Sequence, residues 1–590
     1  MELLQLDAYL LHSAFIHSCY NLSQQREALN AINVFPVADG DTGDNMAATA
    51  KAIISYSTAQ ASLEATCKSI ADAGTLGARG NSGMIFSQFF NGLVENKISV
   101  DHLESPQFAA LIAGACTSVR AAILQPVEGT ILTVMDAWAS SLQQHAKTTA
   151  CFNKLLAKTL PDVEAALQST KKTLAILKEA DVVDSGALGF SLFIQGFATY
   201  LANPLLVIET VDILSCDEHQ HELITAGEPP TVRYCTEAVL RADGIDKSSL
   251  TKALETQGDS IVLSANQRLC HLHLHCNEPW QVFENLQDIG KIQYPKVDDM
   301  LRQYEVLHNR KYPIALVTDS SANIPQDVLD HYQIHVIALN IHLDGHDLLD
   351  KYSLNSLNFY DNLSVLTNYP TTSFPAPTFI EEKIRFLAQH YEEVLVISVA
   401  QILSGTHDAI VKASVNYNNV HVINSRQVSG SQGLLVNHAA ELIADGYSID
   451  NIKQALDAKI DKTHLFVMVD QFDSLIRSGR VSKLKGKFAQ FSGVKPIISL
   501  DKEGKGVIYD KAFSETKALV KLVNIVAELS KTAGLDNYCI VHAGVKEKAE
   551  EFALMTAEVF GHEPAFIEPA STVIGLHAGK GCIAIGAMMN

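Results

Sequence analysis

The sequence contains no run of about 18 consecutive apolar residues, the length from which a segment is considered a membrane span. We therefore expect no integral membrane span. The first residues, MELLQLDAYL, also lack the basic stretch and the apolar core of a secretory signal. Together these two absences favour a cytoplasmic protein.

Positive charge is scarce. The 590 residues include 45 Lys and Arg against 66 Asp and Glu, which gives a formal net charge of −21. Because nucleic-acid backbones are bound by clustered Lys and Arg, we expect no nucleic-acid partner. Anionic substrates would have to be bound by backbone amides, metal ions and a few well-placed cations.

Closely spaced cysteines are rare as well. Of the ten cysteines in the chain, only Cys270 and Cys276 lie near each other in the sequence. Such scatter is typical of a reduced cytosolic protein and argues against a disulfide framework.

The length and the apolar patterns predict several domains. A chain of 590 residues is too long for one core, and about 100–200 residues per domain predicts three to five domains. Over residues 1–205, apolar residues recur at three- and four-residue spacing, which predicts an all-α domain.

The rest of the chain mixes helices and strands. Residues 206–308 predict an α+β domain that opens with a polar linker, Asp217–Thr231. His219 and His221 in this linker could bind a metal, but a solvated loop is the simpler interpretation. Residues 309–590 alternate short apolar runs with amphipathic helices, which predicts a mostly parallel sheet covered by helices.

The first candidate site is the acidic segment Asn33–Asn45, NVFPVADGDTGDN. It holds the carboxylates of Asp39, Asp41 and Asp44, interleaved with glycines. Carboxylates suit Mg²⁺, which binds a few of them together with substrate phosphates, and the glycines would let the backbone bend sharply. The alternative is an acidic turn that caps a helix, with Asp44 or Thr42 at the N-cap.

The second candidate site is rich in glycine. Glycines recur every three residues from Gly74 to Gly83, just before an apolar helical stretch. A glycine-rich loop that leads into a helix N-terminus presents amides and the positive end of a dipole, which suits a phosphate. Arg79 could add charge, and Asn81 or Ser82 could cap or donate. The alternative is close helix packing through small residues, and the spacing matches neither the Walker A nor the Rossmann motif.

Two further segments, PVEGT at 126–130 and VDSGA at 183–187, each open a helix. Taken together and in this order, the four segments resemble the nucleotide-binding domain of the dihydroxyacetone-kinase family (DhaL or DAK2 type). They are more similar still to FakA, the kinase subunit of bacterial fatty-acid kinase. The resemblance covers about residues 1–205 and implies a DhaL-like barrel of antiparallel helices that binds ATP and Mg²⁺ at one end.

This resemblance implies site residues by position. Asp39 and Asp41 would bind Mg²⁺, and Asp44 stands where Thr is usual. The nucleotide would be surrounded by Thr42, Gly43, Asn45, Asn81, Ser82, Gly83, Thr130, Asp184 and Gly186. True dihydroxyacetone kinases carry His at the position of Thr42 and need a substrate-binding partner domain that we do not find in the sequence.

The middle region carries Cys235 and the segment CHLHLHC at 270–276. Alternate residues of a strand share a face, so His271, His273 and His275 would line one side. Imidazole and thiolate ligands favour zinc, and the alternative is a partly exposed histidine stripe. The resemblance to FakA continues through this region and implies a structural zinc site at Cys235, His273 and His275.

The C-terminal region carries polar loops at Pro370–Pro375, Leu403–Thr406, Arg477–Ser482 and Gly575–Gly579. Such groups can converge on a carboxylate while apolar elements flank an alkyl chain. Each loop alone also fits ordinary turn chemistry.

As a set, these loops resemble the DegV family, which provides FakB, the fatty-acid-binding carrier of the same kinase. The resemblance covers about residues 312–590 and implies an α/β DegV fold. By position, Thr372, Ser404 and Thr406 would bind the fatty-acid carboxylate. Arg480 and His577 would lie beside the head group and the incoming phosphate.

The resemblances imply an ATP- and Mg²⁺-dependent kinase that phosphorylates a fatty-acid carboxylate to an acyl phosphate, with Asp39, Asp41, Arg480 and His577 as catalytic residues. A carboxylate is ionised at neutral pH, so no general base is needed. We expect a homodimer and an acceptor enzyme that uses the acyl phosphate in phospholipid synthesis. The alternatives are a kinase for dihydroxyacetone or another small polyol, and a non-catalytic lipid-binding regulatory protein.

Overall fold

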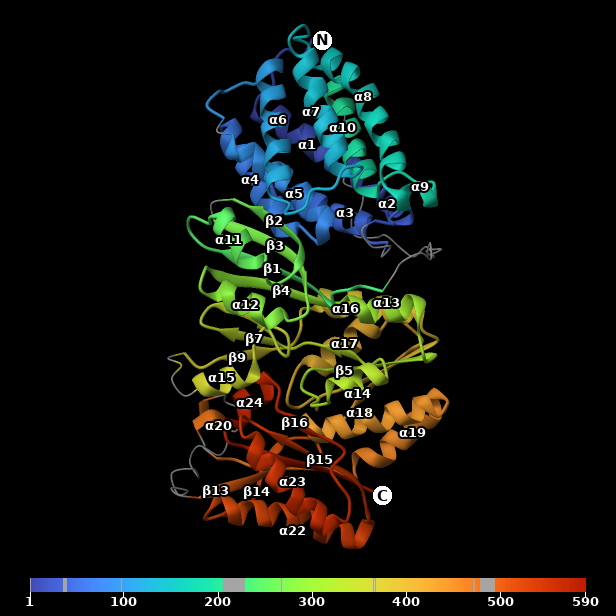
Figure 1. Ribbon diagram of the computed structural model, residues 1–590, viewed down its shortest axis with the longest axis vertical. Helices are drawn as coiled ribbons and strands as arrows, with labels where there is room; N and C mark the ends of the chain where they lie inside the picture. Colours follow the sequence, from blue (N-terminus) through green and yellow to red (C-terminus); the bar gives the residue numbers. More distant parts are fainter. Residues whose placement is uncertain are drawn as a thin grey trace. The chain divides into compact units, whose positions relative to one another are not determined.

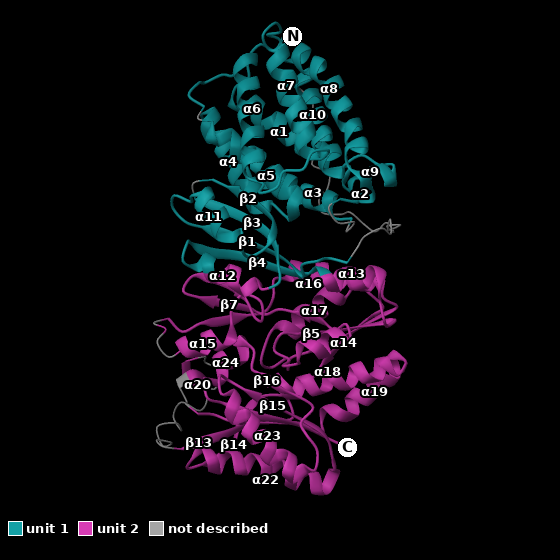
Figure 2. Cartoon of the chain, in the orientation of Figure 1, with its two compact units in different colours: residues 1–277, 285–300 teal, residues 278–284, 301–590 magenta. Residues whose placement is uncertain are grey.

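The protein is described from a computed structural model. The structure describes residues 2–35, 40–96, 98–204, 229–266, 268–363, 366, 368–470, 473–477 and 494–590. Four residues singled out above lie outside the described residues, namely Asp39, His219, His221 and Arg480. The chain divides into two compact units, Met1–Asn277 with Asn285–Met300 and Glu278–Glu284 with Leu301–Asn590 (Figure 2).

The N-terminal part of the first unit is all-helical, as predicted (Figure 1). Its helices are α1 (Ala8–Ser23), α2 (Arg26–Ala31), α3 (Thr42–Tyr56), α4 (Leu63–Gly77), α5 (Gly80–Glu95), α6 (Ser105–Ala121), α7 (Ile131–His145), α8 (Phe152–Thr173), α9 (Ala175–Ala180) and α10 (Ser185–Ala202). None of the helices in the described part of the chain combines the length and the apolar character that crossing a membrane requires.

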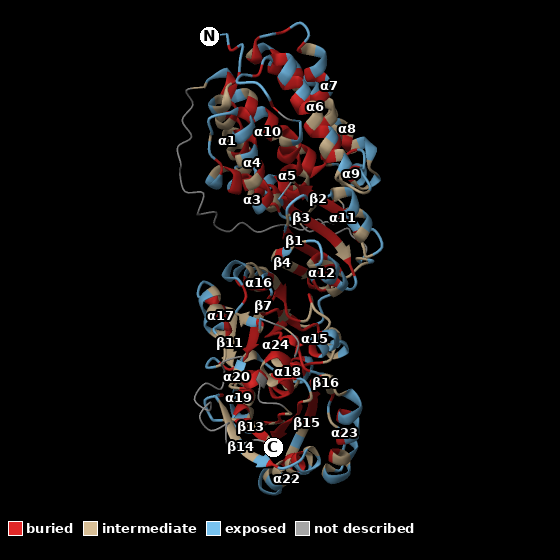
Figure 3. Ribbon diagram, turned by 90° about the vertical axis from the view of Figure 1, so that its left-hand side faces the viewer, coloured by how far each residue is buried: buried red, intermediate tan, exposed pale blue. Residues whose placement is uncertain are grey.

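Aromatic side chains fill the core of this helical domain. Phe86, Phe89 and Phe90 lie at helical spacing on one face of α5, and all three are fully buried. Phe89 meets Phe190 of α10 edge to face, with ring centroids 5.2 Å apart. Figure 3 shows buried residues throughout the interior of this bundle. Since close-packed aromatic rings resist displacement, the helix ends are held in fixed positions.

The repeated glycines lie mainly within helices, which corrects the predicted loop. α4 continues to Gly77 and α5 begins at Gly80, so the non-helical link is Ala78–Arg79. A Cβ added at Gly77 would lie 2.1 Å from Ala52 Cβ of α3. Glycine spacing suggests a loop because glycine disfavours helices, but tertiary packing outweighs that propensity here.

The rest of the first unit is an antiparallel sheet of order β2-β3-β1-β4 with an accompanying helix, in agreement with the predicted α+β region. The elements are β1 (Tyr234–Arg241), α11 (Lys247–Leu254), β2 (Asp259–Ala265), β3 (Leu269–Cys276) and β4 (Lys291–Asp299). The sheet is hydrogen-bonded to α5: the Ser264 hydroxyl donates to Ser87 Oγ at 2.9 Å, and the Ala265 amide donates to Gln88 Oε1 at 2.9 Å.

The second unit is α/β and contains three sheets. A parallel sheet of order β11-β10-β5-β6 is formed by β5 (Ile314–Asp319), β6 (His335–Ile337), β10 (Glu393–Ser398) and β11 (Val420–Asn424). A small antiparallel sheet of order β8-β7-β9 is formed by β7 (Asn340–Leu343), β8 (His346–Leu349) and β9 (Thr371–Ser373).

The third sheet has the order β14-β13-β12-β17-β15-β16 and is formed by β12 (Thr463–Met468), β13 (Lys495–Leu500), β14 (Gly506–Ala512), β15 (Leu535–His542), β16 (Ile567–Pro569) and β17 (Ile583–Met589). Its pairings are antiparallel except for β15 with β16. The prediction of a mostly parallel sheet therefore holds for the first sheet and is wrong for this one, because short apolar runs do not encode strand direction.

The second unit also contains the helices α13 (Met300–His308), α14 (Gln326–His331), α15 (Ser356–Asn362), α16 (Pro377–His390), α17 (Thr406–Ser414), α18 (Ser429–Ala444), α19 (Ile449–Ile460), α20 (Asp473–Arg477), α22 (Glu515–Ala533), α23 (Lys546–Phe560) and α24 (Thr572–Ala578). The residues of α12 (Pro279–Gln287) are divided between the two units. Ala439 and Leu435 of α18 are fully buried in one core with Leu395 of β10 and Cys539 of β15, so α18 packs between the two larger sheets.

Replacing Gly77 by Ala should destabilise the helical domain. The added methyl group would collide with Ala52, so α3 and α4 must move apart. We expect the free energy of unfolding to fall by about 1–3 kcal/mol, the usual cost of overpacking. Urea unfolding followed by the fluorescence of Trp138 measures this loss, in a Trp280→Phe background because the chain has two tryptophans.

Gly74→Ala in the same helix is the matched control. Its Cβ would lie 3.4 Å from Ile53 Cδ1, which is an ordinary contact. Because Ala has a higher helix propensity than Gly, this variant should leave the free energy of unfolding unchanged or raise it by up to about 1 kcal/mol. Equal losses in the two variants would contradict the packing role assigned to Gly77.

Candidate functional site

The four motif segments converge at one end of the helical domain, where α3, α5, α7 and α10 begin. The hydroxyl oxygens of Thr42 in α3 and Ser82 in α5 lie 3.4 Å apart. The Asp184 carboxylate caps α10 by accepting from the Ala187 amide at 2.8 Å, and it also accepts from the amide of Ile131 at the start of α7. Several positive dipole ends therefore face one region, which suits an anion.

Asp41 immediately precedes α3 but does not cap it. Asp41 occupies the N-cap position without a side-chain capping bond, and the helix begins at Thr42. The Asn33 side chain instead accepts from the Thr42 amide at 2.8 Å. Gly40 has a φ of +65°, in the left-handed region that glycine favours, so the chain does bend sharply here. The alternative of a turn capped by Asp44 or Thr42 is therefore wrong.

Asp44 joins α3 to α2. Its carboxylate lies 3.4 Å from Arg26 Nε and accepts from Asn30 Nδ2 at 3.1 Å. The Asp44 amide donates back to Asn30 Oδ1, also at 3.1 Å. The residue that departs from the usual Thr therefore anchors a helix contact.

The start of α5 is polar and tightly packed. Gly80 has a φ of +53°, and a Cβ there would lie 2.3 Å from Asn45 Nδ2. Its amide donates to Glu237 Oε1 at 2.8 Å, so a protein carboxylate already uses this amide. The Asn81 Oδ1 atom is buried without a hydrogen-bond partner among the described residues, which fits a position that a ligand would complete.

The turn before α7 is internally bonded. Thr130 is the N-cap residue of α7, and its hydroxyl donates to the Val127 carbonyl at 2.7 Å. The Gly129 amide donates to Thr133 Oγ1 at 2.8 Å, and Glu128 pairs with Arg120 at 2.8 Å. The structure therefore gives Thr130 a turn-forming role, and its predicted contact with phosphate stays a prediction.

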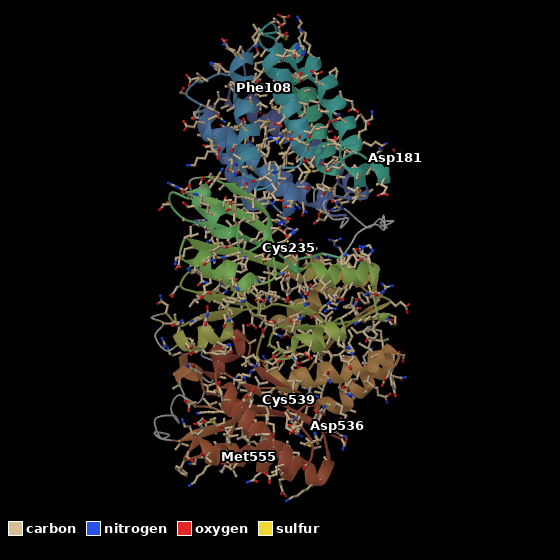
Figure 4. All side chains as sticks on the ribbon, in the orientation of Figure 1. Phe108, Asp181, Cys235, Asp536, Cys539 and Met555 are labelled. Atoms are coloured by element: carbon tan, nitrogen blue, oxygen red, sulfur yellow. The ribbon has the colours of Figure 1, made fainter. Side chains whose placement is uncertain are left out.

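Cys235, His273 and His275 come together on the neighbouring strands β1 and β3 (Cys235 is labelled in Figure 4). Their candidate ligand atoms all lie within 4.8 Å of one another. The two Nε2 atoms are 3.3 Å apart, and Cys235 Sγ lies 3.6 Å from His273 Nδ1. Tetrahedral zinc with bonds of about 2.0–2.1 Å separates two nitrogen ligands by about 3.3 Å, so the histidine spacing fits zinc.

The remaining histidine on this face has another partner. His271 Nδ1 lies 3.1 Å from the carbonyl oxygen of Thr75 in α4. His271 and His273 are buried and His275 is partly exposed, so the alternative of a partly exposed stripe fails for two of the three histidines. Burial lowers the pKa of His275 to about 4, which keeps its ring neutral, as a metal ligand must be.

Sequence reasoning missed three charged residues beside this cluster. Glu237 lies opposite His273 and Lys296 across the strands, and Asp298 lies opposite Cys235. Burial would raise the pKa of Glu237, but the hydrogen bond from His273 and the charge of Lys296 hold it well below its usual value. The available signal was strand alternation, which places Glu237 on the same face as Cys235.

The acidic segment and the cysteine–histidine cluster lie close to each other. Burial raises the pKa of the Cys235 thiol, and the carboxylates of Glu237, Asp298 and, more weakly, Asp41 raise it further. Asp41 therefore lies within electrostatic reach of Cys235. The proposed nucleotide residues and the proposed zinc ligands border the same region of the first unit.

In the second unit, the predicted head-group residues form two hydroxyl-containing pairs. Thr372 of β9 lies 3.4 Å from His577 Nε2 of α24, and Ser404 Oγ lies 2.8 Å from Thr406 Oγ1 at the start of α17. The pairs are adjacent, because a Cβ at Gly405 would lie 3.1 Å from the ring of Phe374. The structure therefore pairs Thr372 with His577 and Ser404 with Thr406, in two loops that approach each other at Phe374 and Gly405, whereas Arg480 is outside the described residues.

Three protein-family models match the chain. They are a DAK2 domain over residues 36–199, a FakA-like middle domain of fatty acid kinase over residues 231–307, and the DegV family of uncharacterised proteins over residues 313–590. The three matches follow one another along the chain.

Curated relatives include protein YloV of Bacillus subtilis, 30% identical over 318 residues, which are 52% of this chain and 57% of YloV. An uncharacterized protein of Staphylococcus saprophyticus is 30% identical over 320 residues, 52% of this chain and 58% of that protein. This chain thus spans less than two thirds of the length of these relatives.

Similar solved structures include DegV, a fatty acid binding protein from Bacillus subtilis, with 27% identity, coverage of 48% of this chain and 100% of that chain, and a TM-score of 0.43. A fatty acid binding DegV family protein from Streptococcus agalactiae has 27% identity, coverage of 47% and 99%, and a TM-score of 0.44.

Asp184→Asn should stabilise the protein increasingly as pH rises. Burial raises the pKa of Asp184 to about 7, so the folded protein holds a proton that the unfolded chain releases above pH 4. Stability of the wild type therefore falls between about pH 4 and 7, whereas Asn keeps the capping oxygen and does not titrate. The gain should grow to at most about 4 kcal/mol, since one pKa unit equals about 1.4 kcal/mol.

Urea unfolding followed by Trp138 fluorescence between pH 4.5 and 8 tests this expectation. The control is Asp181→Asn, because Asp181 is exposed and sits in a left-handed conformation that Asn tolerates. A gain from Asp184→Asn that stays constant with pH would show that Asp184 is already ionised in the folded protein.

Proposed function

We propose that this chain, which combines a DAK2 domain, a FakA-like middle domain and a DegV-family domain in one polypeptide, is a fatty-acid kinase. It transfers the γ-phosphoryl group of ATP to the carboxylate of a fatty acid bound by the DegV-family domain, giving an acyl phosphate and ADP. The observation that carries the proposal is the presence, in one chain, of converging helix N-termini and of a hydroxyl cluster suited to a carboxylate.

The nucleotide side of the reaction uses the helical domain. Helix N-termini attract phosphates, and Asp41, with Asp39, would bind the Mg²⁺ that ATP carries. The hydroxyls of Thr42 and Ser82 lie 3.4 Å apart at this end, and the unpartnered Asn81 Oδ1 is beside them in sequence. The two hydroxyls can donate to phosphate oxygens, and the Asn81 amide oxygen, an acceptor, would instead suit a donor or a cation that accompanies the nucleotide.

The acyl side uses the DegV-family domain. Hydroxyl groups of Thr372, Ser404 and Thr406 can donate to a carboxylate, which accepts several hydrogen bonds. The Thr406 side chain is fully buried and its hydroxyl lies 2.8 Å from Ser404 Oγ, so a carboxylate would have to take the place of part of this pairing. His577, 3.4 Å from Thr372, would lie beside the same group, and Arg480 is proposed to add a cation.

The chemistry needs no general base. A carboxylate oxygen attacks the γ-phosphorus atom, the bond from that atom to the bridging oxygen of ADP breaks, and ADP leaves with its electron pair. Because the carboxylate is already ionised, no proton has to be removed. Catalysis then depends on positioning and on neutralising the charge of the transferring group, through Mg²⁺, helix amides and the cations proposed above.

We also propose that Cys235, His273 and His275 hold a zinc ion. The spacing of 3.3 Å between the two Nε2 atoms and the thiol nearby fit its tetrahedral preference. When bound, the ion would fix β1 to β3 beside the nucleotide end, which makes the site structural. The cytoplasmic location, the homodimer and a separate acceptor enzyme for the acyl phosphate stay predictions.

Trapping of the acyl phosphate tests the kinase. The full chain is incubated with ATP, Mg²⁺, a panel of fatty acids and hydroxylamine, and acyl hydroxamate is measured. We expect product from the wild type and a loss of at least about 100-fold in Asp41→Ala and Ser404→Ala, since each removes a proposed ligand of a reactant.

Two control variants are matched to these. Asp44→Asn alters a carboxylate of the same segment that pairs with Arg26 and Asn30, and Ser448→Ala removes the cap of α19 in the second unit. Both should keep most of the activity. Absence of product from every acid, in a folded protein that binds ATP, would favour a small polyol as acceptor, and a separate measurement of ADP release with dihydroxyacetone would detect that activity. Absence of ATP turnover with either acceptor would favour a lipid-binding regulatory protein.

Metal analysis tests the zinc site. The purified chain should contain about one zinc per polypeptide, and Cys235→Ser should lose it, because a hydroxyl is a poor replacement for thiolate. Cys276→Ser is the control: Cys276 lies next to His275 in sequence, but its sulfur contacts Thr236 Oγ1 at 3.2 Å. Equal zinc loss in both variants, or no zinc in the wild type, would contradict the assignment.

A further inference from the structure

Glu237 is a buried carboxylate with two hydrogen-bond donors on different domains. It lies in the middle of β1 and is 4% exposed. Its Oε1 atom accepts from the Gly80 amide at 2.8 Å and from His273 Nδ1 at 2.9 Å. A carboxylate is costly to bury unless it is hydrogen-bonded, so these two contacts account for its presence.

The first donor belongs to the proposed nucleotide site. Gly80 is the first residue of α5, and its amide lies at the positive end of the helix. A φ of +53° aims this amide away from the direction that a regular helix would give it. By holding the amide, Glu237 fixes the backbone immediately before Asn81 and Ser82.

The second donor belongs to the proposed zinc site. When His273 Nδ1–H donates to Glu237, the Nε2 atom carries the lone pair. That Nε2 atom lies 3.3 Å from His275 Nε2, on the side where a shared ion would bind. A carboxylate that orients a histidine in this way raises the ligand strength of the ring and fixes its orientation.

We propose that Glu237 is a positioning residue that joins the nucleotide end of the helical domain to the cysteine–histidine cluster through one oxygen atom. The inference rests on the proposed function for the identity of the two ligands. The two hydrogen bonds that Glu237 accepts, from the Gly80 amide and from His273 Nδ1, do not depend on either ligand. Loss of Glu237 therefore weakens both sites, although it contacts neither ligand.

Glu237→Met is the informative variant, because Met fills similar space without an acceptor. Two readouts need no ligand. In the ligand-free, metal-stripped full chain, ¹⁵N NMR should show His273 in the Nδ1–H form, a preference that the variant loses. Hydrogen exchange of the Gly80 amide, which is protected in the wild type, should become at least about tenfold faster.

Two further readouts use ligands. Zinc affinity, measured by competition with a chelator, should fall about 10–100-fold in Glu237→Met. Calorimetry should show weaker binding of Mg-ATP by at least threefold in the same variant. Thermal unfolding confirms that each variant is folded.

The matched control is Asp259→Asn. Asp259 lies 3.6 Å from His275 Nδ1, but its side chain is 56% exposed, so water can replace it. This variant should behave like the wild type in all four measurements. A folded Glu237→Met that keeps the His273 tautomer and the Gly80 protection would overturn the proposal. If those two readouts change while the wild type binds neither zinc nor ATP, the positioning role stands and the proposed function fails.

Discussion

An acidic protein that is to bind the anions proposed above has to create positive potential locally. The net charge is −21. In the first unit, several cations are already paired with carboxylates, for example Arg120 with Glu128 and Arg233 with Asp299, at 2.8 and 2.7 Å. Helix N-termini add positive potential from the backbone, although Asp184 and Glu237 already accept from amides at the starts of α10 and α5.

Close helix packing and the proposed phosphate site involve the same glycines. A Cβ at Gly83 would lie 2.7 Å from the Asn45 carbonyl oxygen, so glycine there lets α3 and α5 approach closely. That approach brings Thr42 and Ser82 within 3.4 Å of each other. The two interpretations of the glycine repeat, helix packing and phosphate binding, are therefore not exclusive: close packing creates the polar end at which a phosphate could bind.

The sequence predicts the local parts of this arrangement better than the long-range ones. Helical periodicity identified the N-terminal domain, and strand alternation placed His273 and His275 on one face. Neither pattern predicted that Glu237 accepts hydrogen bonds from both Gly80 and His273. Those contacts depend on how β1 pairs with β3 and on how the sheet packs on α5. The antiparallel β12–β17 pairing was missed for a related reason, since pairing direction is decided by partners far away in sequence. The low helix propensity of glycine predicted a loop at Gly77, but helix packing keeps this residue in α4.

Burial shifts the pKa values of two groups in the first unit in opposite directions. Burial lowers the pKa of His275 to about 4 and raises that of Asp184 to about 7. Near neutral pH, His275 therefore remains unprotonated, and Asp184 acts mainly as a helix cap whose charge is costly. An enzyme that relied on general base catalysis would need a base with a pKa near the working pH beside its acceptor. For the fatty-acid carboxylate that we propose as acceptor this requirement disappears, so the pH dependence of the proposed reaction should arise from folding and ligand binding more than from a proton transfer.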